Sequence, residues 1–571
     1  MDNQTASYTG ADALNDALLQ AGVTHIFLNS GTDYPPIIES WAKCDAEGRA
    51  HPRVIISPHE TAALSAAQGF AQLTGEAQAV FVHVDVGTQN LGGTVHNAFR
   101  CRVPVFLFAG VSPYTIENEL PGSRNAQIQF WQNVGDQAGI VRGYTKMAQE
   151  YHSAKNIRQL TLRAMQLARS DPKGPVYLMA SREVLEEEAL APELDGKLWA
   201  PVAPGAADDA SIKALAYALM KAERPLVITS YLGRNPASVN RLLYLSQRLA
   251  IPVVETYPCY MNFPSSNPLH LGFDSQALIG DADVILALDS DMPWIPALAK
   301  PRAGTRVFYL DVDPIKEHIP LWYIPSELFI KADSYTALGQ LIEVFEENPG
   351  MMNPGAISAR RERVTGLHDE MRAKWREQEG MRPEMTSEYL SACVRELIDD
   401  DTIVLNETIT DSDTVARHIP RGNPGTMFFS GGSSLGWHGG AAVGMKLARP
   451  ERDVVALTGD GTYIFSCPTA VHWMARKYGA PFMTVIYNNS GWNAPKQITM
   501  GQHPGGYAEK LGDFHTSFDP SARLDLIAEA AGGAFARTVS DPKELKTVLA
   551  EGWDAVKGGR AAVINVLLQK V

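Results

Sequence analysis

The sequence has few cysteines, no basic run and no long apolar segment, and each absence excludes a class of protein. Its net charge of −14, without Lys or Arg clusters, argues against nucleic acid and anionic membranes as partners. No apolar run is long enough to span a bilayer, and the polar residues 1–5 do not resemble a signal peptide. The odd number of cysteines, without metal or disulfide spacing, makes a reducing cytoplasm the simplest location: Cys44, Cys101, Cys259, Cys393 and Cys467.

What the chain does contain is a regular alternation of short apolar strands and helical segments. Such alternation indicates parallel sheets with helices on both faces, and 571 residues are too many for one core. We therefore predict an α/β protein of three doubly wound parallel-sheet domains, over residues 1–192, 205–345 and 385–571. A linker over 193–204, interrupted by prolines and acidic residues, and a charged helical linker over 352–380 would join them.

Two polar motifs in the last domain each follow an apolar strand. Gly459-Asp460-Gly461 ends the strand predicted over 454–457, and Asn488-Asn489 ends the strand predicted over 482–487. A helix is predicted between them over 468–478. Because open parallel sheets bind ligands at the carboxyl ends of their strands, both motifs lie where a ligand would bind.

The residue types of these motifs suit a magnesium diphosphate. Asp460 offers an anionic oxygen, an Asn side chain a neutral one, and a carbonyl near Gly491 a third, which leaves positions for phosphate and water. Gly461 would let the backbone approach the phosphates, and Thr462 could donate to them. The alternative is a plain strand-turn-helix with two asparagines in a turn. That alternative is the weaker one, because the two motifs occur together.

Gly-Asp-Gly followed after twenty-six residues by Asn-Asn resembles the thiamine diphosphate signature, and the resemblance extends over nearly the whole chain. The family is that of 2-oxo acid decarboxylases and acetolactate synthases. The resemblance implies thiamine diphosphate and Mg²⁺ as cofactors, with Asp460, Asn489 and the Gly491 carbonyl as metal ligands. It also places Gly459, Gly461 and Thr462 beside the cofactor.

An acidic residue opens an alanine-rich helix in the first domain, in the segment Pro58-His59-Glu60. Taken alone, Glu60 is an acid that the helix dipole favours in a first turn. The segment, however, resembles the one that carries the family's activating glutamate, which hydrogen-bonds the aminopyrimidine N1′ atom. Further along, Val86-Gly87-Thr88-Gln89-Asn90 resembles the family's glycine turn beside the cofactor. The resemblance thus assigns Glu60, Gly87 and Asn90 to cofactor binding.

Two further turns in the last domain resemble cofactor contacts. Thr410, after the strand predicted over 403–405, matches a phosphate-contacting position, and Ile409 departs from a hydroxyl residue often found beside it. In the segment 431–436, Leu435 matches the bulky residue that forces the cofactor into its V shape, and the Ser433 carbonyl would accept from the 4′-amine. Leu435 could equally be an ordinary core leucine.

His83 indicates which branch of the family the chain resembles. A histidine ending an apolar strand is usually structural. The segment from Val82 to Asn90, however, closely resembles that of benzoylformate decarboxylase, whose catalytic histidine falls at this position. Thr32 falls at that enzyme's substrate-binding serine. Gln132 resembles a loop glutamine that faces the active site, although most polar loop residues are only solvated.

The resemblance implies cleavage of a 2-oxo acid between C1 and C2 through a thiazolium C2 carbanion and an enamine, with carboligation as a second outcome. An acetolactate-synthase-like transferase, a 2-hydroxyacyl-CoA or oxalyl-CoA lyase, and a catalytically silent binding relative are the alternatives. Relatives act as homodimers or homotetramers. The segment Asp289-Ser-Asp-Met-Pro-Trp294 departs from the synthases' flavin-binding turn, so we expect a middle domain that only supports the others.

Overall fold

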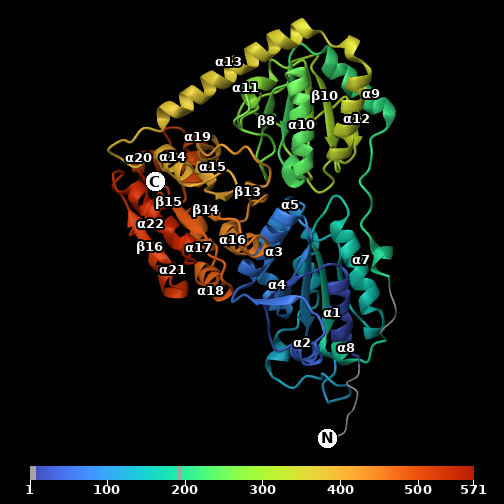
Figure 1. The fold of residues 1–571 in the computed structure, drawn as a ribbon. Helices are drawn as coiled ribbons and strands as arrows, with labels where there is room; N and C mark the ends of the chain where they lie inside the picture. Colours follow the sequence, from blue (N-terminus) through green and yellow to red (C-terminus); the bar gives the residue numbers. More distant parts are fainter. Residues whose placement is uncertain (1–7, 191–194, 571) are drawn as a thin grey trace.

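The structure is a computed structural model that describes residues 8–190 and 195–570, and it contains three parallel sheets (Figure 1). The strand orders are β2-β1-β3-β4-β6-β5, β11-β10-β9-β7-β8 and β13-β12-β14-β15-β17-β16. Every pairing within these sheets is parallel. The predicted architecture of three doubly wound sheets is therefore confirmed. The first and third sheets also share one strand order.

The first domain consists of a sheet whose strands are nearly continuous apolar runs, as expected where helices cover both faces. Its strands are β1 (His25–Asn29), β2 (Arg53–Ile56), β3 (Gln78–Val82), β4 (Val105–Val111), β5 (Ala148–Glu150) and β6 (Val176–Ser181). Its helices are α1 (Gly10–Gln20), α2 (Pro35–Glu47), α3 (Glu60–Thr74), α4 (Val84–Asn90), α5 (Gly92–Arg100), α6 (Ile128–Trp131), α7 (Ile157–Arg169) and α8 (Arg182–Glu186).

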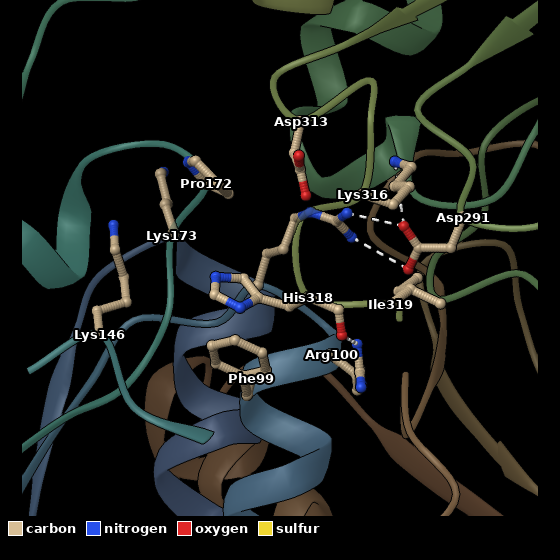
Figure 2. Close-up of a pocket in the computed structure, with 11 residues that line it drawn as sticks. Phe99, Arg100, Lys146, Pro172, Lys173, Asp291, Asp313, Lys316, His318 and Ile319 are labelled. Carbon is tan, nitrogen blue, oxygen red and sulfur yellow. Dashed lines mark hydrogen bonds and ion pairs between the residues drawn. The ribbon is translucent and has the colours of Figure 1, made fainter. Parts of the chain in front are cut away.

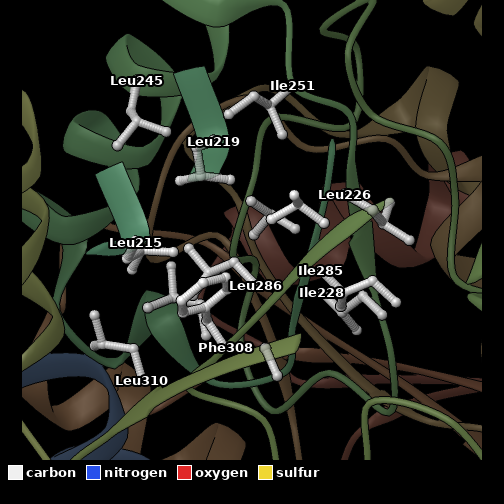
Figure 3. Close-up of a cluster of buried hydrophobic side chains, with 14 of the residues drawn as sticks. Leu215, Leu219, Leu226, Ile228, Leu245, Ile251, Ile285, Leu286, Phe308 and Leu310 are labelled. Atoms are coloured by element: carbon white, nitrogen blue, oxygen red, sulfur yellow. The ribbon is translucent and has the colours of Figure 1, made fainter. Parts of the chain in front are cut away.

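The middle domain encloses its own buried apolar core, part of which Figure 3 shows between the strands and the helices. Its strands are β7 (Pro225–Thr229), β8 (Val253–Glu255), β9 (Val284–Leu288), β10 (Arg306–Asp311) and β11 (Leu328–Lys331). Its helices are α9 (Asp209–Lys221), α10 (Pro236–Leu249), α11 (Gln276–Ile279) and α12 (Ser334–Glu347). The long helix α13 (Pro354–Gln378) then crosses to the third domain (Figure 1). It lies within the segment 352–380 that was predicted as a charged helical linker.

The third domain repeats the arrangement of the first. Its strands are β12 (Ile403–Glu407), β13 (Met427–Phe429), β14 (Val454–Gly459), β15 (Met483–Asn488), β16 (Phe535–Val539) and β17 (Ala562–Leu567). Its helices are α14 (Ser387–Leu397), α15 (Ser412–His418), α16 (Trp437–Ala448), α17 (Asp460–Phe465), α18 (Pro468–Tyr478), α19 (Asn493–Gln502), α20 (Tyr507–Leu511), α21 (Leu524–Gly532) and α22 (Leu545–Lys557). Across the described residues, no helix has the length and apolarity needed to cross a membrane.

Helices α3 and α16 join the first and third domains at very short range (Figure 1). A side chain at Gly69 would overlap the backbone of Ala441, and one at Gly444 would overlap the backbone of Ala66. The small residues of both helices therefore allow the two backbones to approach closely. Because Glu60 begins α3, this contact also fixes where Glu60 stands against the third domain.

Candidate functional site

The first group of predicted residues gathers around Glu60. Glu60 is the first residue of α3, is 7% exposed, and accepts a 3.0 Å hydrogen bond from the Asn90 amide. A side chain at Gly87 would lie 3.2 Å from the nearer Glu60 oxygen. Gly87 therefore keeps one oxygen of this carboxylate uncovered, while Asn90 orients the other. The structure thus brings all three predicted residues together.

The segment predicted as a glycine turn is instead helical. Residues 86–90 lie within α4, a helix of seven residues that begins directly after His83. The resemblance implied a turn here, but the absence of a side chain at Gly87 serves packing, because a side chain there would lie 3.2 Å from a Glu60 oxygen and 3.4 Å from the His83 Cβ atom. The helix also carries Asn90 around to the Glu60 carboxylate, so the correction does not separate the residues.

His83 is the centre of a second set of contacts in the same domain. Its Nε2 atom lies 2.9 Å from the Gln132 amide oxygen, and its Nδ1 atom makes a very short hydrogen bond to Asp33. Burial lowers the pKa of His83, but the hydrogen bond to Asp33 and the charge of Asp33 outweigh it, so the pKa is raised. Thr32, next to Asp33, is exposed in the turn before α2. Asp33 was not predicted as a site residue. In the sequence it is only an acidic residue in a turn, next to Thr32.

The predicted metal ligands lie at the ends of the adjacent strands β14 and β15. Asp460 begins α17 directly after β14, and its Oδ2 atom accepts a 2.9 Å hydrogen bond from the Gly491 N–H group. Burial raises the pKa of Asp460, against the backbone N–H groups that lower it. A cation bound beside Asp460 would relieve this cost, because it would favour the charged carboxylate.

Asn489 offers the strongest sign that a cation fits here. Its Oδ1 atom is buried and has no hydrogen-bond partner in the structure. Buried oxygens without partners are rare, and a cation is one explanation for them. The described residues contain no group of three or more His, Cys, Asp or Glu side chains suited to a metal. A hard cation here would therefore depend on a carboxylate, an amide oxygen and a carbonyl, which is a donor set that suits Mg²⁺.

The glycines around Asp460 differ in how much room a side chain would have. A side chain at Gly461 would overlap the Trp492 ring, and one at Gly491 would overlap the backbone of Thr516. Gly459 is the last residue of β14. The atom nearest to a side chain built there would be the Thr408 carbonyl oxygen, at 3.7 Å. Gly461 thus makes room for an indole ring of its own chain. Only Gly459 leaves open space of the kind that a phosphate could approach.

The remaining predicted contacts of the third domain lie on the turn after β12, in α17 and in the segment between β13 and α16. Thr410 belongs to a single 3-10 turn after β12, in which Ile409 has a φ of +57°. Thr462 is buried in α17. Ser433 and the half-buried Leu435 lie between β13 and α16, where the Ser433 N–H group is 3.2 Å from the His96 ring.

A buried glutamate fixes the loop that holds Ser433 and Leu435. The Glu407 carboxylate, at the end of β12, accepts bonds of 3.0 Å and 2.8 Å from the backbone N–H groups of Trp437 and His438. These are the first two residues of α16, whose free N–H groups need acceptors. Glu407 therefore binds a helix end of its own chain.

Within one chain the two groups are separate. In the described parts of the chain, no hydrogen bond or ion pair joins the Glu60 and His83 group to Asp460 or Asn489. Glu60 does face the third domain, since its charge adds to burial in raising the pKa of Cys467. An open cavity of ≈ 980 Å³ lies at this junction and is lined by Pro58, His59, Ile464, Cys467, Trp473 and Ile527.

Ion pairs occupy the carboxyl edge of the middle sheet. Figure 2 shows Asp291, just after β9, paired with Lys316 at the border with α5 of the first domain. Arg102 approaches the same carboxylate to 2.7 Å, and the two cations hold the pKa of Asp291 well below its usual range despite burial. Asp289 lies 3.7 Å from Arg234. Each of these two carboxylates therefore has a cation of its own chain beside it.

Comparison with known protein families finds matches in all three domains. The N-terminal binding domain of thiamine pyrophosphate enzymes matches residues 8–140, the central domain of these enzymes matches 212–341, and their C-terminal binding domain matches 409–566. Each match lies inside one of the three predicted domains, whose limits stay a prediction. The acetolactate synthase of Bacillus subtilis is 24% identical over 560 residues, which cover 96% of this chain and 91% of that relative.

Solved structures share the fold over the full length. The thiamine diphosphate-dependent 4-hydroxybenzoylformate decarboxylase of Rhodococcus jostii RHA1 has a TM-score of 0.79 at 21% identity, with 99% of both chains covered. The benzoylformate decarboxylase of Polynucleobacter necessarius has a TM-score of 0.78 at 18% identity, covering 99% of this chain and 100% of that one. At these identities the likeness establishes the fold alone.

Proposed function

Because the chain belongs to the thiamine pyrophosphate enzymes, we propose that it is a thiamine diphosphate- and Mg²⁺-dependent decarboxylase of a 2-oxo acid, with carboligation as a second outcome. The observation that carries the proposal is the Asp33–His83–Gln132 set in the same domain as Glu60. A protonated ring near the activating carboxylate suits the protonation that follows the loss of CO₂. The names of the two solved decarboxylases of the same fold agree with it.

The chain's own residues divide the binding of the cofactor between them. Asp460, the Asn489 amide oxygen and the Gly491 carbonyl would hold Mg²⁺ and, through it, the diphosphate, with Thr410 beside them. Glu60 would bond the aminopyrimidine through the oxygen that Gly87 leaves uncovered. When bound, thiamine diphosphate supplies a nucleophilic carbon and accepts the electrons left by departing CO₂.

His83 would supply the proton. Its raised pKa means that the ring keeps the proton on Nε2 to a higher pH than a free imidazole would. That proton can pass to the carbon from which CO₂ has departed, and the neutral ring can then help to release the aldehyde. Since the acid form is the active one, turnover should fall as the pH rises through the pKa of His83.

Replacing His83 by alanine tests this assignment. We expect His83→Ala to retain cofactor binding but to slow turnover by roughly a hundredfold or more, the usual scale for losing a general acid–base group. Turnover and cofactor affinity are measured on the same preparation, with His152→Ala, an exposed histidine of the same domain, as the control. Normal aldehyde release by His83→Ala would make His83 a structural residue.

The substrate is identified by a screen of 2-oxo acids for CO₂ release, with and without an acceptor aldehyde. The proposal predicts an aldehyde product without an acceptor. The match to an acetolactate synthase over 96% of the chain favours one second candidate, a transferase that passes the activated group to a second 2-oxo acid. Acetolactate from pyruvate alone would favour the transferase. A product only from an acyl-CoA would favour the lyase alternative.

We also propose that the active unit is a homodimer or larger, in which the Glu60 group of one chain meets the Asp460 group of another. Exposed apolar side chains support an interface between copies. Ile56, Ile464 and Phe465 are exposed near the Glu60 junction. A second set lies on the loop between β4 and β5 and consists of Tyr114, Ile116, Leu120, Ile128, Phe130, Trp131 and Val134.

Light scattering tests the assembly. We expect a dimer or tetramer, and activity that falls on dilution below the concentration at which the assembly dissociates, because each site needs two chains. Activity and mass are compared over the same dilution series, with saturating cofactor. A fully active monomer would refute the proposed assembly.

A further inference from the structure

Asp33 is a buried acid to which the proposed reaction assigns no role of its own. It lies in the turn between β1 and α2, and it is 4% exposed. One oxygen makes the very short bond to His83 Nδ1, and the other accepts from the Val84 N–H group at 3.4 Å. Both bonds reach from the end of β1 to the residues just after β3, its neighbour in the sheet. Asp33 therefore fastens the His83 ring and the backbone beside it.

The Asp33–His83 pair joins a buried carboxylate to one ionisable base. In the described part of the chain, His83 is the one basic group within ion-pair distance of Asp33. A carboxylate this deeply buried is costly unless an opposite charge or a donor satisfies it. A protonated His83 ring is the cation that supplies this compensation. Asp33 thus favours the charged form of the His83 ring.

Two glycines at strand ends make room for the pair. A side chain at Gly31, just after β1, would overlap the His83 ring at Nδ1. A side chain at Gly110, near the end of β4, would overlap the Asp33 carboxylate. Neither glycine has a left-handed φ angle, so what each position requires is the absence of a side chain. The pair therefore fills a space shaped for it by the ends of neighbouring strands.

Gln132 covers the other side of the ring. Its amide oxygen is 2.9 Å from His83 Nε2, and its own carbonyl is held by the Ser112 hydroxyl. A carboxylate on Nδ1 and an amide oxygen on Nε2 are both acceptors. The ring can satisfy both only when both of its nitrogens carry protons. The Nε2 proton is therefore directed away from Asp33, toward an oxygen that a substrate could replace.

We propose that Asp33 is a positioning residue, which fixes the orientation and the protonated form of His83 so that Nε2 presents a proton in place of its bond to Gln132. The inference deepens the function proposed above and rests on it for the role of His83 in turnover. The orientation itself is a property of the free protein. It can therefore be tested separately from catalysis.

The charges that face the ring set the direction of the effect. They are Asp33 from the turn before α2 and Asp85 from the first turn of α4, with Glu60 across Gly87. Both aspartates favour the protonated ring, but only Asp33 is bonded to it. Loss of the Asp33 charge should therefore lower the pKa of His83, and the active acid form should disappear at a lower pH.

The test measures the pKa of His83 in the full-length protein without cofactor. Diethyl pyrocarbonate modifies only the neutral ring, so the pH dependence of His83 modification, followed by peptide mass spectrometry, gives this pKa. Asp33→Asn keeps the size of the side chain. In this variant we expect the pKa of His83 to fall by about 1 to 3, because an opposite charge is removed. Asp85→Asn is the matched control and should cause a smaller fall. Asp33→Ser repeats the test if the first variant does not fold.

Turnover profiles of the same variants separate the two proposals. We expect the alkaline limb of the wild-type profile to move to lower pH in Asp33→Asn, together with the modification midpoint. An unchanged midpoint in both Asp33 variants would overturn the positioning role. A lowered midpoint with an unchanged turnover profile would support the positioning role, and would instead contradict the proton-donor role of His83.

Discussion

Replacing Glu60 by glutamine is expected to lower turnover by at least about two orders of magnitude and to leave the fold intact. Glutamine has nearly the same shape and can still accept the hydrogen bond from Asn90. What it lacks is the negative charge, and the oxygen beside Gly87 is the one carboxylate oxygen proposed to act on the aminopyrimidine. The cost should therefore appear in turnover more than in cofactor affinity.

Steady-state rates and circular dichroism of the wild type and Glu60→Gln provide the comparison. Glu76→Gln is a suitable control, since it changes an exposed glutamate just after the other end of α3. Wild-type turnover in Glu60→Gln would remove the central catalytic assignment, whatever the protein binds.

Replacing Asp460 by alanine is expected to abolish Mg²⁺-dependent binding of thiamine diphosphate, because the ion would join the protein to the diphosphate. Asp460→Ala also removes the acceptor of the Gly491 N–H group, so some loss of stability is expected. Asn489→Ala avoids this difficulty. The Asn489 Oδ1 atom has no partner to lose, so the free protein should stay as stable while cofactor affinity falls by about 10- to 100-fold.

Calorimetric titration of the two variants, with thermal unfolding of the free proteins, separates binding from stability. Asp401→Ala, at an exposed acid before β12, is the control for removing a negative charge from the same domain. Undiminished affinity in both variants would show that the diphosphate binds elsewhere.

The fold was largely predictable because central parallel strands are continuous apolar runs bounded by polar turns. The strands that the sequence did not reveal, β5, β11, β13 and β16, all lie at sheet edges. They are three to five residues long; β5, β11 and β16 each contain exposed residues, and β13 is buried but only three residues long. Edge strands bury fewer side chains, so their sequences carry less of this signal.

The candidate site was predictable where several of its residues belong to one motif. It was not predictable where residues far apart in the sequence meet only because their strands pair. Asp460 and Asn489 follow neighbouring strands, and the structure places them at one edge of the sheet. Asp33 and His83 lie fifty residues apart, and only the pairing of β1 with β3 brings them together. Likewise, Gly461 suggested a phosphate contact, but the Trp492 ring occupies the space beside it.

The central claim is that Glu60 and the Asp460–Asn489 pair form a site for one thiamine diphosphate with Mg²⁺. Calorimetric titration of the cofactor-free protein with thiamine diphosphate, in the presence of Mg²⁺ and then of a chelator, tests it most directly. The account predicts saturable binding of one cofactor per chain that disappears when the metal is removed. No binding in the presence of Mg²⁺, or equally tight binding in the chelator, would contradict it.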